Sequence, residues 1–237
     1  MINFATYGYG GMNYENAKKR ILIEANNFGV FDHMTGYGHE DLSPEFSQKY
    51  CDILSLKRGG GYWIWKCDVL KQEMSKMDEG DIIVYADAGC TFNTGGKKRF
   101  YEYIQMLKDS PYGVFNFQLK NAPEYSWTTK EIFDHFNIDM NVDKHIVNCN
   151  QLMATVIILQ KNTHSINWLD TYANTISKNK YLFTDIHNKQ QPHPKFIDNR
   201  HDQSVCSIVS KLQGSVVISD ETNGKKKDVP LWATRFR

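Results

Sequence analysis

Short apolar runs recur along this sequence, and they are separated by longer segments in which apolar residues return at helical spacing. The clearest run is "DIIVYAD" at 81–87, and similar runs are "INFATYG", "GVFDHMT", "YGVFNFQL", "QLMATVIILQ" and "SVVISD". Continuous apolar runs of this length are typical of strands that are buried on both faces. The pattern therefore predicts a strand at each of these positions.

The intervening segments carry signals for the starts and ends of helices. "NAKKRILIEANNFG" has apolar residues at helical spacing before a glycine, and "DQSVCSIVSKLQG" ends in the same way at Gly214. Ser43 followed by Pro44 predicts one helix start, and Thr128 with Glu131 three residues later predicts a capping box at another. Strands that alternate with helices predict an α/β fold: a Rossmann-like domain with a mainly parallel central sheet covered by helices on both faces.

The length of the chain fits a single domain. It has 237 residues and no internal repeat. We expect the domain to span residues 1–220. Residues 221–237 contain the charged run "GKKKD" and are expected to form a loosely attached C-terminal tail.

Charge composition narrows the classes of partner. The 28 basic and 27 acidic side chains give a formal charge of +1, so no long-range field would attract nucleic acid or an anionic membrane. No apolar run approaches the roughly 18 residues of a membrane helix, and the N-terminus lacks the leader of a secretory signal. We expect a cytoplasmic protein without membrane insertion, in which local groups hold any anionic ligand.

The cysteines give no sign of a disulfide framework or a zinc site. They are odd in number, widely spread, and lack a Cys-x-x-Cys pair or zinc-like Cys/His spacing. We expect reduced thiols, most of them buried, at Cys51, Cys67, Cys90, Cys149 and Cys206.

Three polar loops stand at positions where a ligand site is expected. "TYGYGG" follows the first predicted strand, "DAGCTFN" follows the strongest one, and "NRHDQS" precedes a late helix. In open parallel sheets, ligands bind in the crevice at the carboxyl ends of the strands. We therefore expect these loops to meet at one site.

Asp87 ends the strongest apolar run and is followed at once by small residues. Its carboxylate could bind a divalent cation, and Gly89 would let a backbone or a diphosphate approach without a Cβ in the way. Asp87 could equally accept hydrogen bonds from turn amides, and the local sequence does not decide between the two roles.

The segment "RGGGYWIWK" combines three glycines with aromatic residues and a lysine. Glycines permit close backbone approach, aromatic rings stack on sugars or bases, and a lysine supplies a point charge for phosphate. We place Trp65 in the core, whereas we expect Lys66 to contact a ligand.

Asp202 stands at the start of the late helix in "DNRHDQS". It could be the N-cap of that helix, or a carboxylate that acts as a general base or stabilises positive charge on a sugar carbon. The neighbouring His201 is interpreted as structural or exposed rather than as a metal ligand, because a lone histidine most often is.

As a set, "GGGYWIWK", "GDIIVYADAGC", "QLMATVIIL" and "NRHDQSVCSIV" resemble motifs of small nucleotide-sugar glycosyltransferases with the GT-A fold, which occur in bacterial polysaccharide loci and in large DNA viruses. The resemblance runs from Phe4 to Ile218. It implies a transferase of the hexosyltransferase type, which moves a sugar from a nucleoside-diphosphate donor, commonly uridine-linked, to a hydroxyl of a glycan or another acceptor.

The resemblance also implies roles for individual residues. The first strand and its loop would hold the nucleoside, the acidic motif would hold Mn²⁺ or Mg²⁺ on the diphosphate, and a late Asp-Gln pair would lie beside the transferred sugar. These roles fall on Ala5, Thr6 and Tyr7 for the nucleoside, on Lys66, Asp87, Ala88 and Gly89 for the diphosphate, on Asp87 for the metal, and on the catalytic Asp202 and Gln203 for the sugar.

The acidic motif departs from the pattern of these enzymes. GT-A enzymes typically carry Asp-x-Asp, whereas this chain has Asp87, Ala88 and Gly89, so the second carboxylate is absent. A metal here could depend more on diphosphate oxygens and water, as magnesium often does. Alternatively, the ion is weakly held or dispensable and Lys66 shares its task.

Two other functions stay open at this level. A non-catalytic carbohydrate-binding protein could use Trp63 and Trp127 for stacking, but aromatic lectin surfaces more often lie on all-β scaffolds. A nucleotidyltransferase acting on sugar phosphates would also be α/β and metal-dependent, but the N-terminal region has no Gly-rich triphosphate loop with a basic residue.

Overall fold

The computed structural model of this chain describes residues 1–189, 191–224 and 226–236. Strands and helices alternate along these residues, as the apolar pattern predicts. The strands are β1 Ile2–Tyr7, β2 His33–Tyr37, β3 Ile82–Ala86, β4 Thr91–Phe92, β5 Val114–Pro123, β6 Asn150–Leu152, β7 Val156–Gln160, β8 Val216–Ser219 and β9 Leu231–Trp232.

The helices vary from single turns to long segments. The longest are α1 Met12–Phe28, α5 Trp65–Ser75, α6 Lys97–Lys108, α10 Thr163–Lys178 and α11 Asp202–Gln213. Shorter ones are α2 Pro44–Lys49, α3 Cys51–Leu54, α4 Gly59–Tyr62, α7 Glu124–Trp127, α8 Lys130–His135 and α9 Lys144–Val147, with 3₁₀ turns at His39–Asp41, Thr94–Gly96 and Lys180–Phe183.

The central sheet has the strand order β2-β1-β3-β7-β5-β6, with β8 paired to β5. Strand β1 is parallel to β2 and β3, and β5 is parallel to β8, whereas β7 is antiparallel to β3 and β5, and β6 is antiparallel to β5. Among the described strands of this sheet, β1, β2, β3, β5 and β8 therefore run the same way. This confirms an α/β fold with a mainly parallel sheet.

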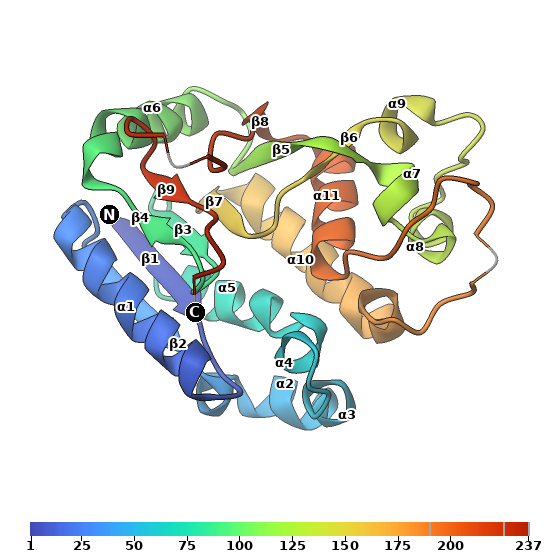
Figure 1. Cartoon of the computed structure of the whole chain (residues 1–237), viewed down its shortest axis with the longest axis horizontal. Coiled ribbons are helices and arrows are strands. Elements are labelled where there is room, and N and C mark those ends of the chain that lie inside the picture. Colours follow the sequence, from blue (N-terminus) through green and yellow to red (C-terminus); the bar gives the residue numbers. More distant parts are fainter. Residues whose placement is uncertain (190, 225, 237) are drawn as a thin grey trace.

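Different helices cover the two faces of the sheet (Figure 1). Along β3, Ile83 and Tyr85 pack in a core with residues of α5, α10 and α11. The alternate residues Ile82 and Val84 pack on the opposite face with residues of α1 and α6. The strand is thus buried on both sides, which explains why its sequence is continuously apolar.

The run "QLMATVIILQ", expected as one strand, is divided into β6 and β7. The residues between them turn their carbonyl groups toward the neighbouring elements: Ala154 O accepts from Lys66 Nζ at 2.9 Å, and Thr155 O accepts from Asp87 N at 2.9 Å. The apolar pattern could not show this break, because the side chains on both sides of it are buried.

Two predicted helix starts differ in outcome. Ser43 caps α2 by accepting from Phe46 N, with Pro44 at the first helical position, as expected. The cap of α8 is Thr129 rather than Thr128, since Thr129 accepts from Ile132 N. Thr128 is buried and donates instead to Glu124 in the preceding helix α7, so the helix starts one residue later than predicted.

The C-terminal residues are more firmly attached than their charge run suggests. Strand β9 pairs with β4, and Glu221 forms an ion pair with Arg99 of α6. Thr234 and Phe236 both donate to Gly89 O, at 2.8 and 2.9 Å. The described residues of the expected tail thus pair with β4 and with the loop after β3.

The thiols follow the sequence-based expectation. All five cysteines are free, and Cys67, Cys90 and Cys206 are buried. Burial raises the pKa of each of these three thiols, so they stay protonated. In the part of the chain that the structure describes, every helix is too short or too polar to cross a bilayer.

Candidate functional site

The parallel strands β1 and β3 end side by side and present their loops at one edge of the sheet. Their register pairs Ala5 with Tyr85, so Tyr7 and Asp87 lie at the ends of the two strands. The loop after β3 is fixed by its backbone, because Asp87 N donates to Thr155 O and Cys90 N donates to Asp87 O. This is the edge at which ligands bind in open α/β sheets.

Lys66 joins two of the predicted loops. It is the second residue of α5, and its Nζ donates to Asp202 Oδ2 at 2.6 Å and to Ala154 O at 2.9 Å. The same Nζ lies 3.4 Å from Asp87 Oδ1. The side chain of Lys66 is only 2% exposed and that of Asp202 is 8% exposed, whereas that of Asp87 is 32% exposed. The loops after β3 and before α11 therefore meet at one buried ammonium group.

The charges of Lys66, Asp87 and Asp202, which we call the Lys66 trio, depend on one another. Burial lowers the pKa of Lys66, but the carboxylates of Asp202 and Asp87 outweigh that effect and hold its pKa above the ordinary value, so Lys66 stays protonated. Burial raises the pKa of Asp202, and Lys66 opposes the rise. The Tyr85 hydroxyl, whose pKa is also raised by burial, donates to Asp87 Oδ1 at 2.8 Å.

A strained backbone positions Asp202. The N-cap of α11 is His201 rather than Asp202, and its φ of 58° with ψ of −120° is rare for a residue with a side chain. His201 N donates to Asn199 Oδ1 at 3.2 Å, which helps to hold the turn. Asp202 is the first helical residue, and its carboxylate pairs with Lys66 instead of capping the helix. Strain of this kind costs about 1–3 kcal/mol and concentrates at functional sites.

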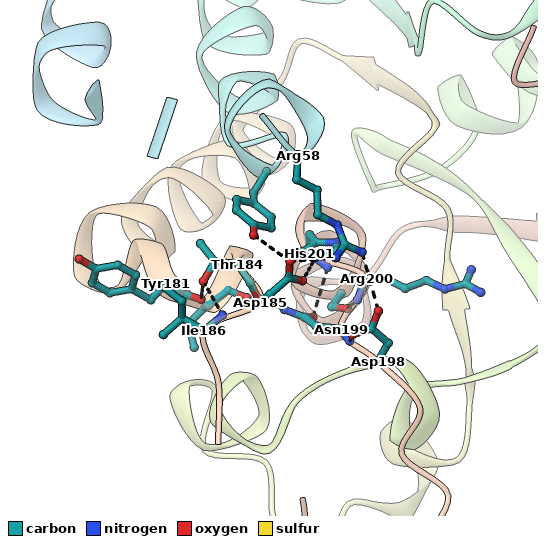
Figure 2. Close-up of polar contacts among 12 residues, drawn as sticks. Arg58, Tyr181, Thr184, Asp185, Ile186, Asp198, Asn199, Arg200 and His201 are labelled. Atoms are coloured by element: carbon teal, nitrogen blue, oxygen red, sulfur yellow. Dashed lines mark hydrogen bonds and ion pairs between the residues drawn. The ribbon is translucent and has the colours of Figure 1, made fainter. Parts of the chain in front are cut away.

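Asp185 holds the His201 turn from the other side, as Figure 2 shows. Its carboxylate is 2.9 Å from His201 Nε2 and accepts from Tyr62 Oη and Arg58 Nη1, each at 2.8 Å. Arg58 also lies 3.8 Å from Asp198. Burial tends to raise the pKa of Asp185, but hydrogen bonds from His201 and Tyr62 outweigh it and lower that pKa. The glycine-rich loop at 58–62 is thus tied to the turn before Asp202.

The end of β1 carries unpaired polar groups. The hydroxyls of Thr6 and Tyr7 are buried and make no hydrogen bond to any residue that the structure describes. Tyr7 stacks on Trp65 with ring centroids 3.7 Å apart, and Trp65 is 4% exposed, which agrees with its predicted place in the core. Ala5 is fully buried within the sheet. Buried hydroxyls without partners are rare and suit hydrogen bonds to a ligand.

The remaining predicted site residues lie close to the trio. Ala88 is 5% exposed, and its carbonyl accepts from Arg20 Nη2 at 2.9 Å. A Cβ added to Gly89 would lie 3.1 Å from Arg235 Cα, so the C-terminal residues pass directly over this glycine. Gln203 follows Asp202 on α11 and donates to Gln151 Oε1 at 2.7 Å.

The side chains at this edge could coordinate a divalent cation only together with oxygen atoms of a bound ligand. Among the residues described, no three His, Cys, Asp or Glu side chains are arranged to hold a metal ion. Asp87 is the exposed carboxylate at this edge, and hard carboxylate oxygens suit Mg²⁺ and Mn²⁺. Magnesium is commonly held by one or two carboxylates together with substrate phosphates. Asp87 therefore fits a cation that a diphosphate also coordinates.

A cavity adjoins the Asp185 turn on the side of α8. Its volume is about 280 Å³. It is lined by Thr129, Glu131, Asn179, Tyr181, Leu182, Ile186, His187 and Asn188. Ile186 in the cavity wall follows Asp185, and Asp185 contacts His201, which precedes Asp202. These contacts connect the cavity to the Lys66 trio.

The sequence missed three charged residues near this site. Asp185 lies in a polar segment without periodicity, and Arg235 lies close to the end of the chain. Arg200 stands in the motif "NRHDQS", two residues before Asp202. Its guanidinium lies 4.0 Å from the centre of the Trp127 ring. Only for Arg200 did the sequence hold a usable signal.

Solved structures with a similar fold include a glycosyltransferase. No protein-family model matches the chain, and neither does any curated protein. A glycosyltransferase involved in the glycosylation of the major capsid of PBCV-1 has a TM-score of 0.50 and 10% identity, covering 98% of this chain and 91% of that one. Mouse xyloside xylosyltransferase 1 has a TM-score of 0.48 and 10% identity, covering 93% of this chain and 85% of that one. The first likeness shows that the chain has a GT-A-like fold.

Proposed function

We propose that this protein is a glycosyltransferase that moves a sugar from a nucleoside-diphosphate donor, commonly a uridine-linked one, to an acceptor hydroxyl. One observation carries the proposal. The buried ammonium of Lys66 lies between Asp87 and Asp202 at the carboxyl ends of parallel strands, within a fold that a glycosyltransferase shares. This edge can hold a charged ligand and place it beside a carboxylate.

The nucleoside end of the donor would bind at the end of β1. The buried, unpaired hydroxyls of Thr6 and Tyr7 support this assignment, because a base or ribose would supply their missing partners. Ala5 contributes through the backbone that places these two side chains. The Tyr7 ring is already stacked on Trp65, which fixes its orientation before a ligand binds.

The diphosphate would lie over the loop formed by Asp87, Ala88 and Gly89. A Mn²⁺ or Mg²⁺ ion held by Asp87 and the phosphates would neutralise charge on the leaving diphosphate. Lys66 holds Asp87 and Asp202 at a fixed separation and offsets part of their charge. Tyr85 orients Asp87 by its hydrogen bond to Oδ1.

Asp202 and Gln203 would lie beside the transferred sugar. In the reaction, the bond from the anomeric carbon to the phosphate oxygen breaks, and its electron pair stays on the diphosphate. The acceptor oxygen forms the new bond and releases its proton to solvent. Asp202 is the catalytic carboxylate, which stabilises the positive charge that develops on the sugar. Its ion pair with Lys66 favours the ionised form that this role requires.

The carbohydrate-binding alternative has less support from side-chain positions. Trp63 packs against His201, with ring centroids 5.4 Å apart, and the Trp127 ring lies against the Arg200 guanidinium. Both rings therefore already contact neighbouring side chains of the protein. An exposed stacking surface of the kind that lectins use would need these faces open.

Ligand-induced stabilisation tests the proposal. Binding to the folded state raises the melting temperature by mass action. We expect one of the UDP-, GDP- or dTDP-sugars to raise it in the presence of Mn²⁺, and we expect Asp87→Asn to reduce that rise. Asp109→Asn at the exposed end of α6 is the matched control. Equal stabilisation of wild type and Asp87→Asn would remove Asp87 from the donor site.

A further inference from the structure

Residues 233–236, which we call the C-terminal strap, lie on the loop that follows β3. Thr234 Oγ1 and Phe236 N both donate to Gly89 O, at 2.8 and 2.9 Å. Thr234 Oγ1 also lies 2.9 Å from Thr91 Oγ1. The last residues of the chain thus form a wall beside the proposed diphosphate site, more than 140 residues away in sequence.

Arg20 of α1 fastens the strap and the loop to the same helix. Its Nη2 donates to Ala88 O and Cys90 O, each at 2.9 Å, and to Phe236 O at 3.2 Å. Its guanidinium carbon also lies 5.0 Å from the centre of the Phe236 ring. One side chain therefore sets the position of the strap relative to the loop.

Gly89 provides the space in which the strap lies. An added Cβ would stand 3.1 Å from Arg235 Cα and 3.4 Å from its carbonyl carbon, which is closer than most real contacts. Arg235 itself has a φ of 51°, in the left-handed region that side chains disfavour. Such conformations concentrate at ligand clamps.

A diphosphate at this edge needs a further cation. Lys66 is one cation set against the carboxylates of Asp87 and Asp202, so the trio alone has a net negative charge and would repel a diphosphate. Arg200 precedes Asp202 by two residues, and Arg235 lies against Gly89. Burial lowers the pKa of Arg200, the positive charge of Arg235 lowers it further, and the Asp198 carboxylate raises it.

We propose that Arg235, presented by the C-terminal strap, binds the phosphate oxygens of the donor's diphosphate. This assignment rests on the proposed function and extends it to a residue outside the predicted motifs. Guanidinium groups suit phosphate because their planar donors match its oxygens.

Calorimetric titration with inorganic pyrophosphate, UDP and uridine tests this assignment. Losing a charge-assisted hydrogen bond should weaken binding by about 10-fold or more. We therefore expect Arg235→Ala to bind pyrophosphate and UDP at least about 10-fold more weakly, with uridine binding unchanged, and Arg235→Lys to be intermediate. Lys227→Ala, at an exposed basic residue of the same C-terminal region, should bind like wild type.

Gly89→Ala provides a second, independent variant. Its added methyl group would press on the strap, so it should weaken pyrophosphate binding while Arg235 is still present. Equal pyrophosphate affinity of wild type and Arg235→Ala, or no binding of pyrophosphate and UDP by wild type, would overturn the assignment. Weakened anion binding in a protein that transfers no sugar would leave the strap site standing and refute only the glycosyltransferase proposal.

Discussion

Lys66 Nζ donates a 2.6 Å hydrogen bond to Asp202 Oδ2, and so links the start of α5 to the start of α11 inside the fold. Both side chains are almost fully buried. A buried ion pair seldom adds much net stability, because desolvation offsets its attraction. The pair is better explained by positioning, since it fixes a carboxylate beside the edge where β1 and β3 end.

Removing only the cation of this pair should be costly. Lys66→Met would leave Asp202 buried and unpaired, so we expect the free energy of unfolding to fall by about 3–5 kcal/mol. The double variant Lys66→Met with Asp202→Asn should recover part of this loss, because no unpaired buried charge remains at Asp202. Urea denaturation measures both. A single variant as stable as wild type would show that Lys66 is not the counterion of Asp202.

Removal of divalent cations should abolish turnover. If Asp87 and the diphosphate share a Mn²⁺ or Mg²⁺ ion, EDTA should lower the transfer rate at least about 100-fold, and added Mn²⁺ should restore it. The rate of Asp87→Asn should be low with or without added Mn²⁺. Full turnover in EDTA would mean that the basic residues alone neutralise the leaving diphosphate.

The contact between Asp185 and His201 should matter for rate more than for donor affinity. Asp185→Asn would loosen the strained turn that positions Asp202, and a displaced catalytic group of this kind can cost about 100-fold in rate. We expect kcat to fall by about 10- to 100-fold, with KM for the donor little changed. Asp198→Asn removes a longer, exposed contact to Arg58 and should stay within about twofold of wild type. Equal kcat values for both variants would refute the positioning role of Asp185.

The attachment of the C-terminal residues should depend on pH through Glu221. Hydrogen bonds from Arg99, with a further one from Tyr103, lower the pKa of Glu221 in the folded protein. The stability from this group is therefore complete above its unfolded pKa of about 4.3 and is lost as pH falls through the lowered folded value. The melting temperature of Glu221→Gln should lie below that of wild type at pH 7, and the gap should close as pH falls below the unfolded pKa of about 4.3. Glu79→Gln, at an exposed site, is the control, and a constant gap across this range would contradict the prediction.

Local patterns were sufficient for much of the fold. Three features depend only on neighbouring residues, and each lies where the sequence predicts it. They are the strand in the run 81–87, the end of α1 at Gly29, and the Ser43 cap of α2. The general rule that loops after parallel strands converge explains why the loops after β1 and β3 lie together, whereas Lys66 of α5 and Asp202 of α11 reach this edge through long-range packing.

Other features depend on long-range packing that the sequence does not encode locally. The break between β6 and β7 is flanked by buried apolar residues, and the single polar residue in it, Thr155, is too weak a signal to mark it. The partner of His201 is Asp185, in a polar segment without periodicity, and the strap reaches Gly89 from the far end of the chain. Gly89 did indicate a close approach, but the observed neighbour is the protein's own backbone.

Release of nucleoside diphosphate from UDP-, GDP- and dTDP-sugars, with Mn²⁺ and a mixture of hydroxyl acceptors, tests the central claim most directly. We predict that wild type releases nucleoside diphosphate from at least one donor and that a folded Asp202→Asn variant is at least about 100-fold slower. Turnover of no donor, or release of pyrophosphate from a nucleoside triphosphate and a sugar phosphate instead, would contradict the claim.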